Sequence, residues 1–159
     1  MVETDLSIVA VIRSSGERTE EICKDIVASQ VGGMNTHLIK EKPFSAAVRK
    51  TFEIGIASEK KWTLAVDADI LLSENAIKKM VINAESLDEK IKEKLFVYQG
   101  NFVCKIFGEL RHVGCHLYQT KYLERCMEFL DETASSVRPE SANYYKMVDI
   151  GYYHYIDNN

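Results

Sequence analysis

The sequence has no surplus of basic residues and no apolar run that approaches the length needed to cross a bilayer. Its 20 Lys and Arg residues are outnumbered by 24 Asp and Glu residues, which gives a formal net charge of -4 and a pI near 5.6. A chain of this kind offers no broad cationic surface, which argues against a protein that holds nucleic acid mainly through phosphate contacts. Any phosphate group that it binds must be held locally.

The N-terminal stretch MVETDLSIVAVIR carries acidic residues where a signal peptide would carry basic ones. We therefore expect a cytoplasmic protein without a transmembrane segment. With 159 residues, 46% of them apolar, the chain is long enough for one well-packed domain and too short for two. Residues 1–159 are accordingly interpreted as a single domain.

The sequence also lacks a CxxC pair. In an intracellular chain, isolated cysteines are expected to be reduced and partly buried. Cys115 and His116 are adjacent and His112 is nearby, but this spacing fits no zinc-ligand pattern. The four cysteines are Cys23, Cys104, Cys115 and Cys126.

The first half of the sequence alternates strand and helix patterns three times. A continuous β-branched run at 6–13 predicts a strand buried on both faces, and apolar residues at helical spacing predict a helix at 19–30. Strands at 36–41 and 62–66 are each followed by a further helix. This alternation predicts right-handed crossovers and a doubly wound α/β fold with a mostly parallel sheet. The apolar stripes of the second and third helices consist of Phe44, Val48, Phe52 and Ile56, and of Ile77, Met80, Val81 and Ala84.

The second half is less regular. Residues 85–94 are expected to form a solvated helix or loop, and residues 95–108 have the composition of a strand with a glycine break. A helix at 122–130, a last helix at 140–150 and a strand at 152–156 complete the predicted order.

Two aspartates, Asp67 and Asp69, follow the third predicted strand in the stretch KKWTLAVDADILL. Ligands of open α/β sheets bind at the carboxyl ends of the strands. Residues two apart on an extended chain point to the same side, so both carboxylates should face one small volume. A divalent cation beside them would relieve their repulsion. The alternative is that one aspartate caps the next helix, although Ser73 is better placed for that cap.

A strand that ends in two aspartates also occurs in haloacid-dehalogenase-like phosphatases. In that family the strand opens the fold, and a threonine usually follows the second aspartate at one remove. Here two predicted strands come first, and Leu71 occupies the place of the threonine. A phosphatase of this type is therefore only the third candidate function.

A closer resemblance is carried by the stretch KKWTLAVDADILLSENAIKKM at 60–80, which resembles the core of glycosyltransferases with the GT-A fold, especially family-two-like enzymes, where a strand ends in a DXD motif. Upstream, 7–30 resembles the opening strand, loop and helix of that family, and 43–58 resembles the helix before the DXD strand. Downstream, GCHLYQTKYLE and RPESANYYKMVDIGYYHY resemble its later segments. The resemblance implies a three-layer α/β/α, GT-A-like (Rossmann-like) fold with a mostly parallel sheet.

The resemblance also implies a function and a site. The function is metal-dependent, inverting transfer of a sugar from a UDP- or GDP-sugar to an acceptor that the sequence does not identify. Mn2+ or Mg2+ would bind Asp67 and Asp69, with Asp69 as the more direct ligand, and His154 is a further candidate ligand. Glu140 falls where the family places the catalytic base. The expected nucleotide-binding residues are Arg13, Ser14, Ser15, Arg18, Glu41, Arg49 and Asp67.

The sequence departs from the family pattern in several places. Lys50 replaces the asparagine that follows the family's arginine, and Glu41 stands where the second strand usually ends in an aspartate followed by a Gly-Ser turn. The acid pair of the late turn is reduced to Glu140, between Pro139 and Ser141. The chain also ends shortly after His154. We therefore expect a minimal or C-terminally truncated domain. The alternative function is a non-catalytic module that binds a nucleotide or nucleotide sugar.

Overall fold

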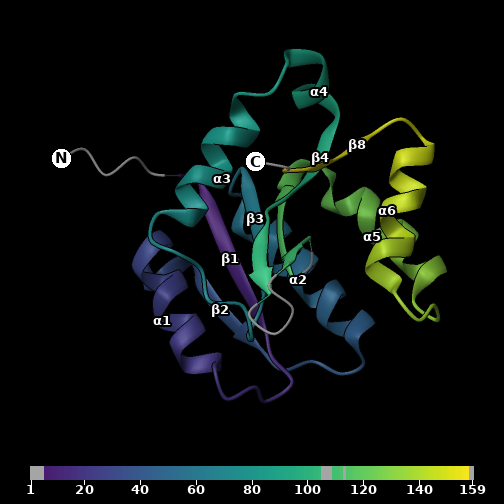
Figure 1. The fold of residues 1–159 in the computed structure, drawn as a ribbon. Coiled ribbons are helices and arrows are strands. Elements are labelled where there is room, and N and C mark those ends of the chain that lie inside the picture. The colour runs from purple at the N-terminus through teal and green to yellow at the C-terminus, as the bar shows by residue number, and fades with distance from the viewer. Residues whose placement is uncertain (1–5, 105–108, 113, 158–159) are drawn as a thin grey trace.

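The computed structural model describes residues 6–104, 109–112 and 114–157 (Figure 1). Its strands are Ile8–Arg13 (β1), Thr36–Ile39 (β2), Trp62–Asp67 (β3), Leu95–Gln99 (β4), Phe102–Cys104 (β5), Glu109–Arg111 (β6), Cys115–Gln119 (β7) and Tyr153–Ile156 (β8). Its α-helices are Glu20–Val31 (α1), Phe44–Ser58 (α2), Ala76–Glu85 (α3), Glu89–Lys94 (α4), Leu123–Thr133 (α5) and Pro139–Asp149 (α6). Short 3-10 turns cover Gly33–Asn35 and Thr120–Tyr122.

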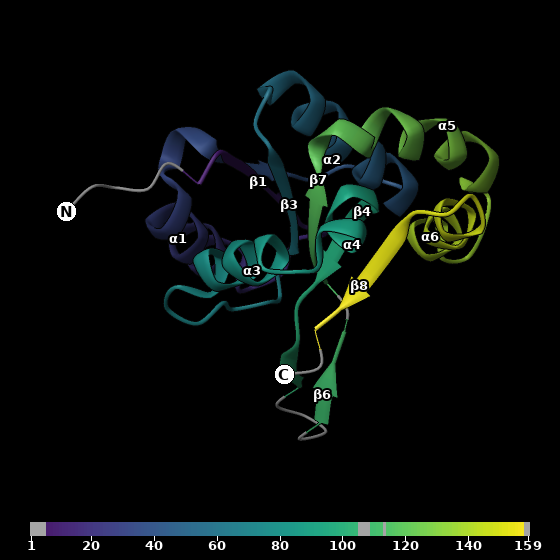
Figure 2. The ribbon, with the colours of Figure 1, turned by 90° about the horizontal axis from the view of Figure 1, so that it is seen from above.

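The main sheet has six strands in the order β2-β1-β3-β7-β4-β8. Strand β1 pairs in parallel with both β2 and β3, and β4 pairs in parallel with β8. Strand β7 is antiparallel to both of its neighbours, β3 and β4. The predicted mixed α/β fold with a mostly parallel sheet is therefore confirmed. Strands β5 and β6 form a separate antiparallel pair, and β6 projects from the body of the molecule in Figure 2.

Helices cover both faces of the sheet (Figure 2). One face packs against α1 and α3 in a core that contains Val27, Leu64 and Ile77. The opposite face packs against α2, α5 and α6 in a core that contains Phe52 and Leu123. Alternate residues of β3 belong to these two cores, as the period of two of a strand requires, with Leu64 in the first and Ala65 in the second. In β1, Ala10 and Ile12 belong to the first core, whereas Val11 packs in a smaller cluster with Ile39 and Ala47. The chain therefore has the three layers that its resemblance implied.

The predicted strands and helices of the first half are confirmed to within a few residues, with two corrections. Ser73 does not cap the third helix: this helix begins at Ala76, after Asn75 in a left-handed conformation (φ 59°). The carbonyl of Ser73 instead accepts hydrogen bonds from the Gln30 side chain and the Ala76 N–H. Phe44, placed in the buried stripe of the second helix, is 45% exposed and faces the two cavities described below.

Strand β7 is the main element that the sequence analysis missed. The sequence analysis places CHLYQ only in a stretch that resembles a later segment of the family and predicts no strand there, whereas every residue in it is buried. Polar His116 and Gln119 hide the apolar pattern because their side chains are buried through hydrogen bonds rather than through apolar contact. The strand lies between β3 and β4 and so brings the C-terminal half against the end of β3.

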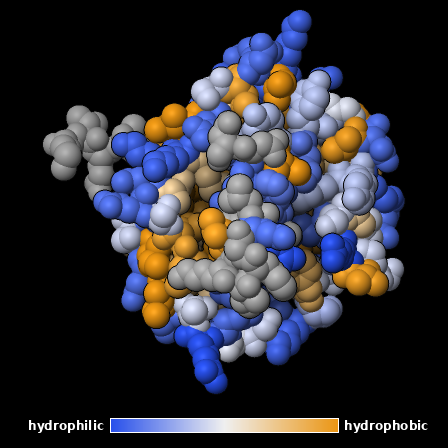
Figure 3. All heavy atoms as spheres, viewed as in Figure 1, coloured by the Kyte–Doolittle hydropathy of each residue, from blue (hydrophilic) through white to orange (hydrophobic). Residues whose placement is uncertain are grey.

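The cysteines agree with the expectation where they are described. Cys23, Cys115 and Cys126 are free and buried; the side chain of Cys104 lies outside the described part. Within residues 6–104, 109–112 and 114–157, no helix is long and apolar enough to cross a membrane. Hydrophilic residues cover most of the face seen in Figure 3, with hydrophobic residues in small groups among them.

Candidate functional site

The carboxyl ends of β1 and β3 border a first cavity of about 510 Å³. It is open to solvent beside Ser15, Glu41 and Asp69, which are all exposed. Of the residues predicted to bind a nucleotide or metal, Arg13, Ser14, Ser15, Glu41, Asp67 and Asp69 line this cavity. The structure thus brings together the predicted loop, the predicted acid of the second strand and the aspartate pair.

Arg13 and Asp67 are neighbours across the parallel β1–β3 pair, with side chains on the same face of the sheet. The Nε and Nη2 atoms of Arg13 lie 2.9 Å and 2.8 Å from Oδ1 of Asp67. The Arg13 side chain is buried, and its guanidinium also lies over the ring of Phe44, 5.0 Å from the ring centroid. Burial raises the pKa of Asp67, and the nearby Arg13 opposes this shift. Asp69, two residues on, is exposed.

Glu140, the predicted catalytic base, reaches the same arginine from the first turn of α6. Its Oε1 accepts hydrogen bonds from Arg13 Nη1 at 2.8 Å and from the Tyr118 hydroxyl at 2.5 Å. Burial alone would raise the pKa of Glu140, but Arg13, His116 and Tyr118 stabilise its charged form and lower the pKa to about 2. Arg13 therefore joins Asp67 and Glu140, and the Glu140 carboxylate is charged at neutral pH.

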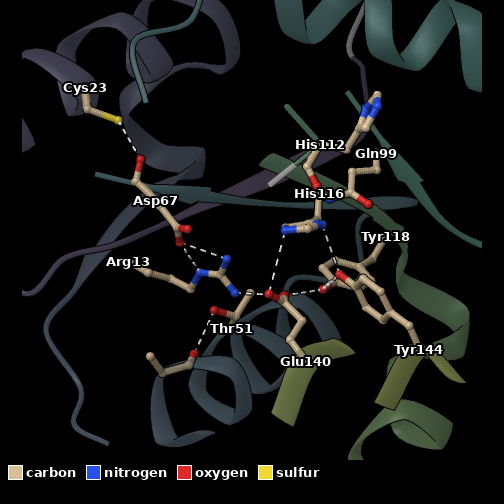
Figure 4. A network of polar contacts seen from close by, with 11 residues as sticks. Arg13, Cys23, Thr51, Asp67, Gln99, His112, His116, Tyr118, Glu140 and Tyr144 are labelled. Carbon is tan, nitrogen blue, oxygen red and sulfur yellow. Dashed lines mark hydrogen bonds and ion pairs between the residues drawn. The ribbon is translucent and has the colours of Figure 1, made fainter. Parts of the chain in front are cut away.

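The buried network continues from Glu140 through β7 and α6 (Figure 4). The Tyr118 and Tyr144 hydroxyls are 2.5 Å apart, and the Tyr144 hydroxyl lies 3.0 Å from Nδ1 of His116. Nε2 of His116 lies 3.7 Å from Oε2 of Glu140. Burial lowers the pKa of His116 to about 4, so the imidazole is neutral at pH 7. Sequence reasoning gave no role in this site to His116, Tyr118 or Tyr144; the alternation of His116 and Tyr118 on β7 would have been the signal, had the strand been recognised.

A second cavity of about 600 Å³ lies beside this network. Asp67 and Phe44 line both cavities, so the two meet at the end of β3. The second cavity is also lined by Glu140, by histidines from β7, β8 and the segment before β7, and by side chains of α6. Its position next to Asp67 places any molecule bound there beside a molecule bound in the first cavity.

Gly114, immediately before β7, allows this close meeting of β3 and β7. Its carbonyl accepts a 2.8 Å hydrogen bond from the Asp67 N–H. Its φ is +76°, and a Cβ atom there would lie 3.0 Å from Oδ2 of Asp67 and 3.2 Å from Ile70. A side chain at this position would therefore strain the backbone and press on the Asp67 carboxylate.

The remaining predicted site residues lie elsewhere. Arg18 is exposed and does not line the first cavity. Arg49 lies on α2, where it forms an ion pair with Asp131 of α5, and it also does not line that cavity. His154 lines the second cavity, and its Nε2 lies 2.7 Å from Oε1 of Gln99. The structure does not group His154 with Asp69.

The acids of the first cavity suit a cation only in part. Asp67 and Asp69 offer two carboxylates to one cavity, but Oδ1 of Asp67 is engaged by Arg13. Across the residues that the structure describes, no three His, Cys, Asp or Glu side chains form a group that could hold a metal ion. Mg2+ commonly binds through one or two carboxylates with substrate phosphates as its other ligands. The donor set fits a cation that binds together with a diphosphate.

Comparisons with known proteins agree on the fold. No family model matches the chain, and no curated protein sequence matches it significantly. The structure is similar to the crystal structure of a glycosyltransferase involved in the glycosylation of the major capsid of PBCV-1, with a TM-score of 0.58 and 14% identity over 94% of this chain and 81% of that chain. It is also similar to the crystal structure of A197 from STIV, with a TM-score of 0.53 and 12% identity over 74% of this chain and 67% of that chain. The mixed α/β fold is thus consistent with that of a Rossmann-like glycosyltransferase.

Proposed function

We propose that this protein is a metal-dependent glycosyltransferase that moves a sugar from a UDP- or GDP-sugar to an acceptor hydroxyl, with inversion. The observation that carries the proposal is the first cavity, where Arg13, Asp67 and Asp69 meet at the carboxyl ends of β1 and β3. The similarity in fold to a glycosyltransferase supports this reading of the cavity. The nucleotide diphosphate would lie at these strand ends, where ligands of open α/β sheets bind.

In this proposal each group at the first cavity has a separate task. Asp69 and the free oxygen of Asp67 would hold Mn2+ or Mg2+, which would offset the negative charge that develops on the departing diphosphate. The hydroxyls of Ser14 and Ser15 would flank the phosphates or ribose, and Glu41 would lie beside the base; all three line this cavity. Arg13 is a permanent cation on the wall of this cavity and so a second charge for the phosphates.

Glu140 would act as the base. As the bond between the sugar anomeric carbon and the diphosphate oxygen breaks, the acceptor oxygen forms the new bond to that carbon and its proton passes to Glu140. In the present structure Arg13 and Tyr118 occupy Oε1 of Glu140, and a carboxylate with a pKa of about 2 is a weak base. Attraction of Arg13 toward a bound diphosphate would weaken its pair with Glu140 and raise the basicity of that carboxylate.

The same contacts favour a second candidate, a non-catalytic module that binds a nucleotide or nucleotide sugar. If Glu140 stays paired with Arg13 when the nucleotide binds, its carboxylate serves only to hold Arg13 against Asp67. Such a module would retain the first cavity without performing transfer.

Release of nucleotide from donor sugars separates the two candidates. We would incubate the protein with a panel of UDP- and GDP-sugars, in Mn2+ and in EDTA, and measure free UDP or GDP formed by transfer to water. The glycosyltransferase proposal predicts release with at least one donor in Mn2+, loss of release in EDTA and in Asp69→Asn, and about a hundredfold slower release in Glu140→Gln, the low end of what a general base contributes. Metal-dependent binding of a donor without any release would select the binding module.

A further inference from the structure

The second cavity has two chemically different walls. One wall is apolar and comes mainly from α6 and the turn before it, where Val137, Tyr145 and Val148 are 98%, 72% and 46% exposed. Large apolar side chains are seldom left this exposed together around one cavity unless they meet a ligand or partner. Phe44 and Ile156 extend this wall toward the first cavity and toward β8.

The other wall consists of hydrogen-bonding groups. Gln99, His116 and His154 line it, and burial lowers the pKa of both of these histidines, so they are neutral at pH 7. His112 also lines this wall, and its Nδ1 is shielded from solvent without a hydrogen-bond partner among the described residues. A buried polar atom of this kind is normally satisfied, which makes it a candidate contact for a bound hydroxyl.

The charges around the second cavity favour a neutral ligand. Asp67 and Glu140 are both paired with the single cation Arg13, so they leave no positive charge free for an anionic ligand. The remaining charged lining residues, Arg111 and Arg138, come from β6 and from the residue before α6, and both are exposed to solvent, which screens their charge. The buried polar lining residues Gln99 and His116, the latter neutral at pH 7, suit hydroxyl groups better than carboxylates or phosphates.

We propose that the second cavity binds a neutral sugar ring of the acceptor, with Tyr145 as the platform for its apolar face and His112, His116 and His154 around its hydroxyls. A pyranose has a face of C–H groups and a rim of hydroxyls, and these match the two walls. Tyrosine is suited to such a platform because it offers a rigid apolar face with a polar tip. A cavity of about 600 Å³ is large enough for one or two sugar rings.

This inference rests on the proposed function and makes it more specific: the acceptor is a carbohydrate, and its reacting hydroxyl lies near Glu140. Both Asp67 and Phe44 line the first cavity as well, so a sugar in the second cavity would border the donor. Tyr145 is a specificity-determining residue in this account and takes no part in the chemistry.

Binding of simple glycosides tests the proposal directly. We would measure saturation-transfer NMR and titrate chemical shifts with the methyl glycosides of glucose, galactose, mannose and xylose, and with glucose 6-phosphate and O-phosphoserine as charged probes. We expect at least one neutral glycoside to bind in the millimolar range and more tightly than either charged probe. Tyr145→Ala should weaken that binding about three- to tenfold, the loss typical of one aromatic contact. The matched control is Tyr153→Ala, since Tyr153 is 45% exposed but does not line the cavity, and it should bind the glycoside as the wild type does.

Three results would contradict the proposal that the second cavity binds a sugar ring. Absence of binding by all four methyl glycosides, tighter binding of a charged probe, or equal binding by wild type and Tyr145→Ala would each overturn the proposal. Binding of UDP and GDP in Mn2+, measured on the same samples, separates this failure from that of the proposed function. A protein that binds a nucleotide but no glycoside keeps the first cavity as a donor site and loses only the carbohydrate acceptor.

Discussion

The two halves of the molecule contribute to the site in opposite ways. The N-terminal half, with β1, β2 and β3 in parallel, places charged and hydroxyl side chains at an open cavity, where Asp69 is exposed. The C-terminal half contributes a buried and mostly uncharged network through β7 and α6, in which His116, Tyr118 and Tyr144 are joined by hydrogen bonds. The halves meet along the β3–β7 pairing, and Arg13 joins their polar side chains because it contacts Asp67 on one side and Glu140 on the other. In the proposed function, the first half binds the charged donor while the second orients the acceptor that reacts with it.

The largest effect is expected from breaking this junction. Arg13→Met would leave Asp67 and Glu140 without their shared cation, and removing one partner of a buried ion pair typically costs about 3–5 kcal/mol. We expect a loss of this size in the free energy of unfolding, measured with urea at pH 7. The double variant Arg13→Met/Glu140→Gln should recover part of this loss, since the second substitution removes one of the two carboxylates that Arg13→Met leaves unpaired. No loss in Arg13→Met would mean that the two halves are not held together by this arginine.

The pH dependence of the free energy of unfolding tests whether His116, in the C-terminal network, is held neutral in the folded protein. The pKa of His116 is about 4 in the folded protein against an ordinary value of 6.5, so between these values the unfolded chain binds more protons. The contribution of His116 to the free energy of unfolding should therefore be fully present above pH 6.5 and fall by roughly 3 kcal/mol as the pH is lowered to about 4. Glu140, with a pKa of about 2, adds a further loss below about pH 4.5.

The matched variants for this titration are His116→Gln and His37→Gln. His37 is an exposed histidine on β2, so its replacement should leave the pH dependence as it is in the wild type. His116→Gln should flatten the stability curve between pH 6.5 and 4, whatever its effect at pH 7. An unchanged slope in His116→Gln would show that His116 is not held neutral in the folded protein.

Substitutions at two glycines distinguish an effect on core packing from an effect on the candidate site. Gly55 of α2 lies so close to β3 that a Cβ atom would be 2.4 Å from Oγ1 of Thr63, and Gly55→Ala should destabilise the protein by about 1–3 kcal/mol through overpacking. Gly114→Ala should cost a similar amount through its positive φ and its contact with Asp67. The two variants are expected to differ in nucleotide affinity, which only Gly114→Ala should reduce. Urea unfolding would measure the stability of both variants, and calorimetry their nucleotide affinity. Equal nucleotide affinity in the two variants would show that Gly114 does not shape the nucleotide site.

The smallest effect is expected at Arg49. Its ion pair with Asp131 lies at the surface, where such pairs contribute about 0–1 kcal/mol. Arg49→Gln should therefore change stability little, and because Arg49 does not line the first cavity, it should bind nucleotide as the wild type does. A clear loss of nucleotide affinity would restore the role that the sequence resemblance implied for Arg49.

The two halves also differ in how much of them the sequence predicts. Strands β1 and β3 are local apolar runs, and Asp67 and Asp69 stand directly after one of them, so both the fold of this half and its acids can be inferred from neighbouring residues. The order of β7 and β4 in the sheet depends on contacts between distant segments, and the polar residues of CHLYQ conceal the strand. The contact between Arg13 and Glu140 joins residues 127 positions apart. Glu140 was proposed from a resemblance, but no local pattern could show that its partner is Arg13.

The measurement that tests the central claim most directly is calorimetric titration with UDP and with GDP, in Mn2+ and in EDTA, for the wild type and Asp69→Asn. Because Oδ1 of Asp67 is engaged by Arg13 and the described residues form no group of three metal-binding side chains, we expect Mn2+ alone to bind weakly and the nucleotide to bind with it. The account predicts binding of at least one nucleotide in Mn2+, lost in EDTA and weakened at least tenfold in Asp69→Asn. Binding that is the same in EDTA or in the variant, or no binding of either nucleotide in Mn2+, would contradict it.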